Sequence, residues 1–236
     1  MLPCIVALGF GLALGQAADP TQDRVAKGVA AELPSLVSLY KHFHANPELS
    51  FMEVETAKRL AAELRDAGLA MLYVGAESGD DEVLERVNKG ESYASTADAL
   101  HKAGEAGLKR SVMILNGLGG SSLTDQHADN SARLVNETQP EFVSTLVVSF
   151  PQGMERFQTR YPDFTPLTQE QLFHELQRFV GALELDNTTF RSDHASNALV
   201  LKGELGRDKA QLLGQIEQAI ARPQSAGLRP EWMRGL

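Results

Sequence analysis

The spacing of apolar and polar residues changes once along the chain, close to residue 70. Between residues 21 and 69, apolar residues recur at helical spacing. This pattern predicts one amphipathic helix interrupted near Pro34 and a second over residues 51–67 that stops at Gly68. Beyond residue 70, short apolar runs alternate with amphipathic stretches. Such alternation is typical of parallel strands joined by right-handed crossover helices, so we predict an α/β fold.

Three apolar runs have the length and composition of buried strands. They lie at residues 71–74, 111–116 and 142–150. Helices are predicted over residues 80–88, 96–106, 123–138, 168–183 and 207–221. Asp80 and Asp81 suit the positive start of their helix, and Thr168 is the predicted N-cap of another. The tail over residues 223–236 has little periodicity, and we expect it to be loosely structured.

Composition excludes several classes of function. The chain has 236 residues, of which 43% are hydrophobic and 22% charged, as expected of a soluble globular protein. Its net charge is −9 with no long basic run, which argues against nucleic-acid partners and anionic membranes. Cys4 is the single cysteine. We therefore expect no internal disulfide and no cysteine-based zinc or iron–sulfur site.

Residues 1–18 resemble a secretory signal peptide. An apolar run over residues 5–14 is followed by the small residues Ala17 and Ala18, where cleavage would occur. The run is too short for a membrane span, although no Lys or Arg precedes it. A buried N-terminal helix is the alternative. The resemblance implies an exported or periplasmic chain with no stable membrane span after cleavage.

Residues 19–69 resemble the opening of M20-type metallopeptidases and amidohydrolases. The similarity lies in LPSLVSLYKHFHANPELSFMEVETAKRLAAELRDAGL. In that family the zinc ligands belong to an H-x-D motif and later acidic and histidine positions, none of which follows here. His42 and His44 supply two donors, whereas a zinc site needs three or four that converge. We therefore interpret this segment as helical, with ordinary surface histidines and no metal site.

Residues 67–236 carry a second resemblance, formed by four motifs in order. GAESGDDEVLERVNKG, SVMILNGLGG, FPQGMERF and FRSDHASN resemble the C-terminal half of radical S-adenosylmethionine (SAM) enzymes of the Fe–S oxidoreductase type. The resemblance implies a partial (β/α) barrel over residues 70–222 with about three parallel strands, plus N-terminal and C-terminal helices. It also implies SAM and a [4Fe–4S] cluster as cofactors.

The same resemblance assigns candidate SAM-binding residues and no catalytic ones. Those after the first strand would lie beside the methionine or ribose part: Gly75, Glu77, Ser78 and Gly79. Those after the second would lie near the adenine: Asn116, Gly117 and Gly119. The C-terminal hallmark segment supplies residues without an assigned role: Asp193, His194, Ser196 and Asn197.

Physical chemistry agrees with these assignments in kind but leaves alternatives. Glycines after a strand let a ligand approach the backbone, and Glu77 can accept from an ammonium or a ribose hydroxyl. However, residues 117–120 could equally form a tight strand-to-helix turn. The contiguous residues 192–194 could suggest a hydrolase triad, but triad residues come from separate loops, so we favour local turn bonds.

Cluster chemistry in this family requires three cysteines in a C-x3-C-x2-C loop, and the chain has one cysteine. We therefore expect a truncated radical SAM-like protein that retains SAM binding without radical catalysis. The alternatives are a fragment of an M20-type enzyme and a non-catalytic exported scaffold. Because radical SAM enzymes work in the cytoplasm, the signal-like leader points to a gene fusion, a rearranged remnant or an assembly artefact. Open sheet edges would be covered by the N-terminal helices or would cause self-association.

Overall fold

A computed structural model of the chain describes residues 20–49, 52–151 and 153–234. The chain divides into two compact units, Met1–Met52 and Glu53–Leu236. The expected signal peptide over residues 1–18, and Cys4 with it, lie outside the described residues. Export therefore stays a prediction. Among the described residues, no helix is both long enough and apolar enough to cross a membrane.

The first unit contains a single described helix, α1 (Pro20–Ala45), which passes through Pro34 without a break. The interruption expected at Pro34 is therefore wrong. Proline removes one intrahelical hydrogen bond and frees the carbonyl of residue 30. No residue of α1 is buried, so water can solvate that carbonyl, and the helix continues at a tolerable cost.

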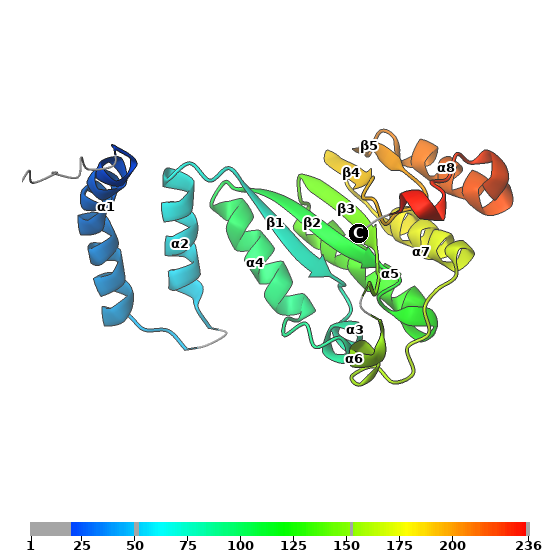
Figure 1. Cartoon of the computed structure of the whole chain (residues 1–236), viewed down its shortest axis with the longest axis horizontal. Helices are drawn as coiled ribbons and strands as arrows, with labels where there is room; N and C mark the ends of the chain where they lie inside the picture. Colours follow the sequence, from blue (N-terminus) through cyan, green and yellow to red (C-terminus); the bar gives the residue numbers. More distant parts are fainter. Residues whose placement is uncertain (1–19, 50–51, 152, 235–236) are drawn as a thin grey trace, which may run out of the picture. The chain divides into compact units, whose positions relative to one another are not determined.

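The second unit holds all the strands that the structure describes. Its elements are α2 (Val54–Asp66), β1 (Met71–Glu77), α3 (Asp81–Arg86), α4 (Tyr93–Glu105), β2 (Lys109–Asn116), α5 (Gly120–Thr138), β3 (Phe142–Val147), α6 (Glu155–Gln158), α7 (Gln169–Ala182), β4 (Thr188–Ser192), β5 (Leu201–Leu205), α8 (Lys209–Ala221), η1 (Pro223–Ser225) and η2 (Glu231–Met233). The five strands form one sheet in the order of the chain (Figure 1). The first four are parallel, and β5 is antiparallel to β4.

The α/β fold class is confirmed, but the expected number of about three strands is too low. The predicted runs correspond to β1, β2 and β3, whereas β4 and β5 were missed. The reason lies in composition. The buried residues of β4 are Thr188, Phe190 and Ser192. Only one of these three is apolar, so the segment does not form an apolar run in the sequence.

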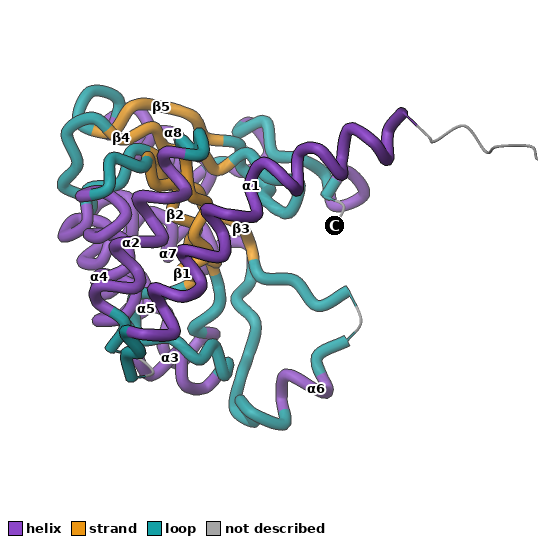
Figure 2. Tube along the Cα trace, turned by 90° about the vertical axis from the view of Figure 1, so that its left-hand side faces the viewer, coloured by secondary structure: helices purple, strands orange, loops and turns teal. Residues whose placement is uncertain are grey.

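One face of the sheet carries the helices, because parallel neighbours joined by right-handed crossovers place every crossover on the same side. α4, α5, α7 and α8 form a continuous layer in which each contacts the next. Val112, Ile114 and Val143 point into this layer and are fully or almost fully buried. Tyr73 lies on β1 and is 74% exposed. Figure 2 shows the loop that carries α6 on the other side of the strands from α4 and α5.

The amino edge of the sheet is fixed by Arg110, near the start of β2. Its guanidinium donates to the carbonyls of Thr138 and Gln139, each at 2.9 Å, and to Glu141 Oε1 at 2.9 Å. The backbone N–H of Arg110 also donates to Glu141 Oε2 at 2.6 Å. These bonds join the start of β2 to the connection between α5 and β3.

Helix starts follow the predicted chemistry. Thr168 and Gln171 form a reciprocal capping box at the start of α7, so the predicted N-cap is confirmed. The Asp80 carboxylate accepts the Val83 N–H at 2.9 Å and caps α3. Gly68, the predicted stop of α2, has a φ of 95°, a conformation that suits glycine.

Candidate functional site

The predicted site residues follow the carboxyl ends of β1, β2 and β4. Because these strands are parallel, their carboxyl ends meet at one edge of the sheet, the usual place for a ligand in an open α/β sheet. The structure does not gather all of these residues into one cavity. It distributes them among an open face, a turn packed on α5, and a small pocket beside α7.

Glu77 ends β1 in a strained conformation. Its φ is 64°, which non-glycine residues seldom adopt, and the pairing with β2 shifts register between Gly75 and Glu77. The carboxylate lies over Gly75, where a Cβ would be 2.5 Å from Glu77 Oε1 and 3.8 Å from Met113 Cε. Lys89 donates to Oε1 at 3.3 Å. Glycine at position 75 therefore makes the room that the Glu77 carboxylate occupies.

Ser78 and Gly79 pack against α5. Ser78 is fully buried, with its Oγ 2.8 Å from His127 Nδ1. Gly79 donates its N–H to Ser131 Oγ at 2.9 Å, and a Cβ at this position would overlap the backbone carbonyl of Asn130. These contacts give both residues a packing role that needs no ligand.

Gly117 and Gly119 form the tight turn that sequence reasoning had kept as an alternative. Gly117 has a φ of 83° and donates its N–H to Glu175 Oε1 at 2.6 Å. The carbonyl of Gly119 accepts the hydroxyl of buried Tyr161 at 2.7 Å. A Cβ on Gly119 would lie 3.0 Å from His127 Cβ, so close packing against α5 favours glycine.

Behind this turn lies a buried acid and a buried histidine that sequence reasoning missed. Glu175 also accepts from Thr124 Oγ1 at 2.6 Å, and its Oε1 is 4.0 Å from His127 Nε2. Burial raises the pKa of Glu175 to about 7, although its two hydrogen bonds oppose the shift. Burial lowers the pKa of His127 to about 4. A glutamate between Phe173 and Leu176 on α7 was the available signal.

The SDHASN segment ties β3 to β4 through local bonds. His194 Nδ1 lies 2.9 Å from Ser196 Oγ, and that oxygen accepts the Val147 N–H at 3.1 Å. Asn197 donates to the Thr145 carbonyl at 2.7 Å and to Ser192 Oγ at 3.0 Å. The expected turn bonds are therefore present.

Asp193 faces away from this network toward β5. Its carboxylate pairs with Lys202 Nζ at 2.8 Å. The hydrogen bond from Lys202 holds the pKa of Asp193 below its ordinary value. Asp193 and His194 thus engage different partners, and a Ser/His/Asp relay is not assembled.

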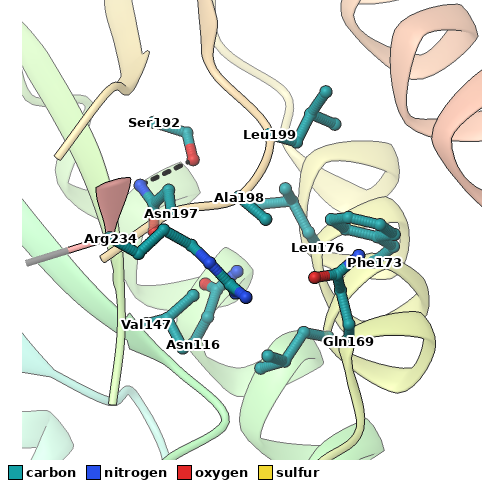
Figure 3. Close-up of a pocket in the computed structure, with 11 residues that line it drawn as sticks. Asn116, Val147, Gln169, Phe173, Leu176, Ser192, Asn197, Ala198, Leu199 and Arg234 are labelled. Atoms are coloured by element: carbon teal, nitrogen blue, oxygen red, sulfur yellow. Dashed lines mark hydrogen bonds between the residues drawn. The ribbon is translucent and has the colours of Figure 1, made fainter. Parts of the chain in front are cut away.

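A small pocket of about 20 Å³ lies where β2 and β3 end beside α7 (Figure 3). Its lining is Asn116, Val147, Gln169, Leu172, Phe173, Leu176, Ser192, Asn197, Ala198, Leu199 and Arg234. It brings together Asn116 and Asn197 of the predicted site. Asn116 and Ile114 are two residues apart on β2, so both side chains lie on the helical face of the sheet. Gly75 and its partner Met113 lie on the open face. Glu77 and Asn116 therefore serve different faces of the sheet.

Metal donors do not converge in the described part of the chain. No group of three or more His, Cys, Asp or Glu residues there could hold an ion. His42 and His44 are both exposed on α1, two residues apart, and so point in nearly opposite directions. A [4Fe–4S] cluster needs three thiolates, and the whole chain contains Cys4 alone. The residues of this chain do not fit that cluster.

Residues 27–135 match the model of the Radical SAM superfamily. The match covers β1, β2 and most of α5. It begins within α1, so it also includes part of the segment that resembles M20 enzymes. The comparisons support neither the resemblance to M20 enzymes nor a signal peptide, and no curated protein matches the chain.

Among solved structures, the chain is similar to the archaeal Methanocaldococcus infernus Elp3 with an N-terminal deletion. The two share 15% sequence identity with a TM-score of 0.47. The alignment covers 72% of this chain and 39% of that one. The chain thus spans well under half the length of this neighbour, and no functional argument follows from similarity at this level.

Proposed function

We propose that residues 53–236 form a radical SAM-like module that binds SAM at the carboxyl end of β1 and does not itself assemble the [4Fe–4S] cluster. On this proposal the chain is a truncated member of that superfamily that holds the ligand without radical catalysis. The observation that carries the proposal is the conformation of Glu77, within the matched range of residues 27–135.

A left-handed backbone at a glutamate costs on the order of 1 kcal/mol or more, and such strain gathers at ligand sites. Here the strain holds a carboxylate over Gly75, on the face of the sheet opposite the helical layer. Its side chain is 29% exposed, and Lys89 is its ion-pair partner. A carboxylate so placed can accept hydrogen bonds from ribose hydroxyls or from the ammonium of a methionine moiety.

Gly75 contributes through the absence of a side chain. It is the direct partner of Met113 on the neighbouring strand, and its missing Cβ leaves the space in which the Glu77 carboxylate lies. Glycine thus allows the Glu77 carboxylate to take the position from which it would bind the ligand. The proposal therefore assigns binding to Gly75 and Glu77, and leaves Ser78 and Gly79 as packing residues.

Calorimetry with SAM tests the proposal. We expect saturable binding by the whole chain and a loss of about tenfold in affinity for Glu77→Gln, the size expected for one charge-assisted hydrogen bond. Glu85→Gln is the matched control, because Glu85 is exposed on α3 nearby and its removal changes net charge equally. Heat that is absent at millimolar SAM, or equal binding by Glu77→Gln, would reject the proposal.

A chain that bound no SAM would favour the non-catalytic scaffold. A fragment of an M20-type enzyme would instead bind zinc stoichiometrically, which metal analysis of the purified chain would detect. The proposal places the module in the cytoplasm, where relatives of the superfamily work. Detecting a mature chain shortened by residues 1–18 in an exported fraction would oppose that location.

A further inference from the structure

The C-terminal tail, residues 222–234, returns from α8 to the SDHASN segment. Arg229 donates its backbone N–H to the Ala198 carbonyl at 2.8 Å. Its guanidinium donates to the carbonyls of His194 at 2.6 Å and Asp193 at 3.1 Å. Leu228 packs against the main core beside this contact. The tail is therefore docked on the loop that follows β4.

Five residues beyond Arg229, the side chain of Arg234 extends into the pocket beside α7 (Figure 3). Its Nε is buried and has no hydrogen-bond partner. None of the eleven lining residues is acidic. Within the described part of the chain, Arg234 has no ion-pair partner either. The guanidinium therefore lacks hydrogen-bond acceptors, and a partly buried cation is stabilised when an anion supplies them.

Neutral donors lie around the same space. Asn116 is buried at the end of β2, and Gln169 opens α7 on the other side. Neither carboxamide is hydrogen-bonded to a described residue. The remaining wall is mostly apolar and includes Leu172, Phe173 and Leu176. The pocket thus offers one cation and two free amides on a mostly apolar lining that also includes Ser192 and Asn197.

We propose that this pocket binds the carboxylate end of a small organic acid, with Arg234 as its ion-pair partner. A volume of about 20 Å³ holds little more than one water, so only the acid group enters while its body lies at the open mouth. A planar carboxylate matches the two parallel N–H groups of a guanidinium. A single cation also favours a monoanion over a more highly charged phosphate. This inference goes beyond SAM binding, because the pocket lies on the opposite face from Glu77.

Titration of the whole chain with butyrate at constant ionic strength tests the inference. The readout is calorimetry together with emission of Trp232, the chain's single tryptophan, which is 83% exposed two residues before Arg234. We expect saturable butyrate binding with a Kd on the order of 1 mM, because a single enclosed ion pair provides modest affinity. The neutral isostere butyramide is expected to give no saturable signal.

Four variants make the test specific. Arg234→Gln is expected to weaken butyrate binding at least about tenfold, and Arg234→Lys to weaken it less, because an ammonium lacks the planar fork. Arg222→Gln removes an exposed charge from the same tail and is expected to bind as the wild type does. Arg229→Gln keeps the Arg234 side chain but removes the hydrogen bonds that dock the tail, so this variant is expected to bind butyrate more weakly.

Four results would overturn the inference. These are no saturable binding of butyrate, equal binding of butyramide, tighter binding of inorganic phosphate than of butyrate, and unchanged binding by an Arg234→Gln variant. Urea unfolding of each variant is the control for folding. A midpoint equal to that of the wild type shows that a loss of binding does not come from a loss of fold.

Discussion

Two arginines at opposite edges of the same sheet differ in almost every respect. Arg110, at the amino edge, directs its guanidinium to Glu141 and to neighbouring carbonyls and is 9% exposed. Arg234, at the carboxyl edge, has a buried Nε without a partner. The amino edge is therefore a completed hydrogen-bond network, whereas the carboxyl edge keeps unused bonding capacity.

The same difference extends beyond the two arginines. Three buried side-chain polar atoms in the described residues lack a partner: His127 Nε2, Thr145 Oγ1 and Arg234 Nε. All three lie toward the carboxyl ends of the strands, and the perturbed pKa of Glu175 belongs there too. Unsatisfied and perturbed groups of this kind lower stability and gather at functional sites. One edge thus has its polar groups satisfied within the fold, and the other keeps polar groups without partners.

Breaking the amino edge should have the largest effect. We expect Arg110→Met to reduce the free energy of unfolding by about 3 kcal/mol, because the buried Thr138 carbonyl loses its donor and the Glu141 carboxylate loses the guanidinium. Arg234→Gln should change it by less than about 0.5 kcal/mol, because the buried Nε has no hydrogen bond to lose. Urea unfolding at pH 7 measures both. Equal losses in the two variants would erase the contrast between the edges.

The buried acid at the carboxyl edge should respond to pH. The folded pKa of Glu175 is raised to about 7 from an ordinary 4.5, so its contribution to stability is full below pH 4.5 and is lost as pH rises through 7. Glu175→Gln mimics the protonated acid. We expect this variant to exceed the wild type by on the order of 3 kcal/mol at pH 8 and to match it near pH 4.5.

His127 should show the opposite slope. Its folded pKa is lowered to about 4 from 6.5, so its contribution is present above pH 6.5 and is lost as pH falls through 4. His127→Gln should remove that loss on the acid side. Unfolding curves between pH 4 and 8 compare the two variants. Parallel pH profiles would show that burial does not govern these two groups.

A substitution at Gly79 separates a packing role from a binding role. A Cβ there meets the Asn130 backbone, so Gly79→Ala should reduce stability by about 1–3 kcal/mol without need of a ligand. Gly214→Ala on α8 is the control, because its Cβ meets nothing within 4 Å and should stabilise the helix by about 0.5–1 kcal/mol. Thermal unfolding distinguishes them. If Gly79→Ala had the stability of the wild type, the packing role would be wrong and Gly79 would again be a candidate for ligand binding.

The sequence predicted most of the parallel sheet because β1, β2 and β3 are apolar runs flanked by helices with clear caps, such as Thr168 and Asp80. It did not predict β4, where Thr188 and Ser192 are buried through hydrogen bonds rather than through apolar contact. At Pro34 the sequence predicted a helix interruption that does not occur, because an exposed helix tolerates the missing hydrogen bond.

The candidate site was predicted by position along the chain and not by face. Glu77 and Asn116 both end strands, but a strand alternates its side chains, and the register shift at Gly75 decides which way Glu77 points. Arg234 gave no signal at all, because its approach to Asn116 depends on the tail docking through Arg229. Contacts between segments this far apart follow only from the fold.

The reversal of β5 has a consequence for the growth of the sheet. Of the two outer strands, β1 runs with the parallel series and β5 runs against it. A strand that continued the series, with its crossover helix on the same face as α4, would have to pair at β1. A strand added beyond β5 in the direction of the series would be antiparallel to β5. The sheet therefore has a polarity, and a parallel strand from another molecule would extend it on the side of β1.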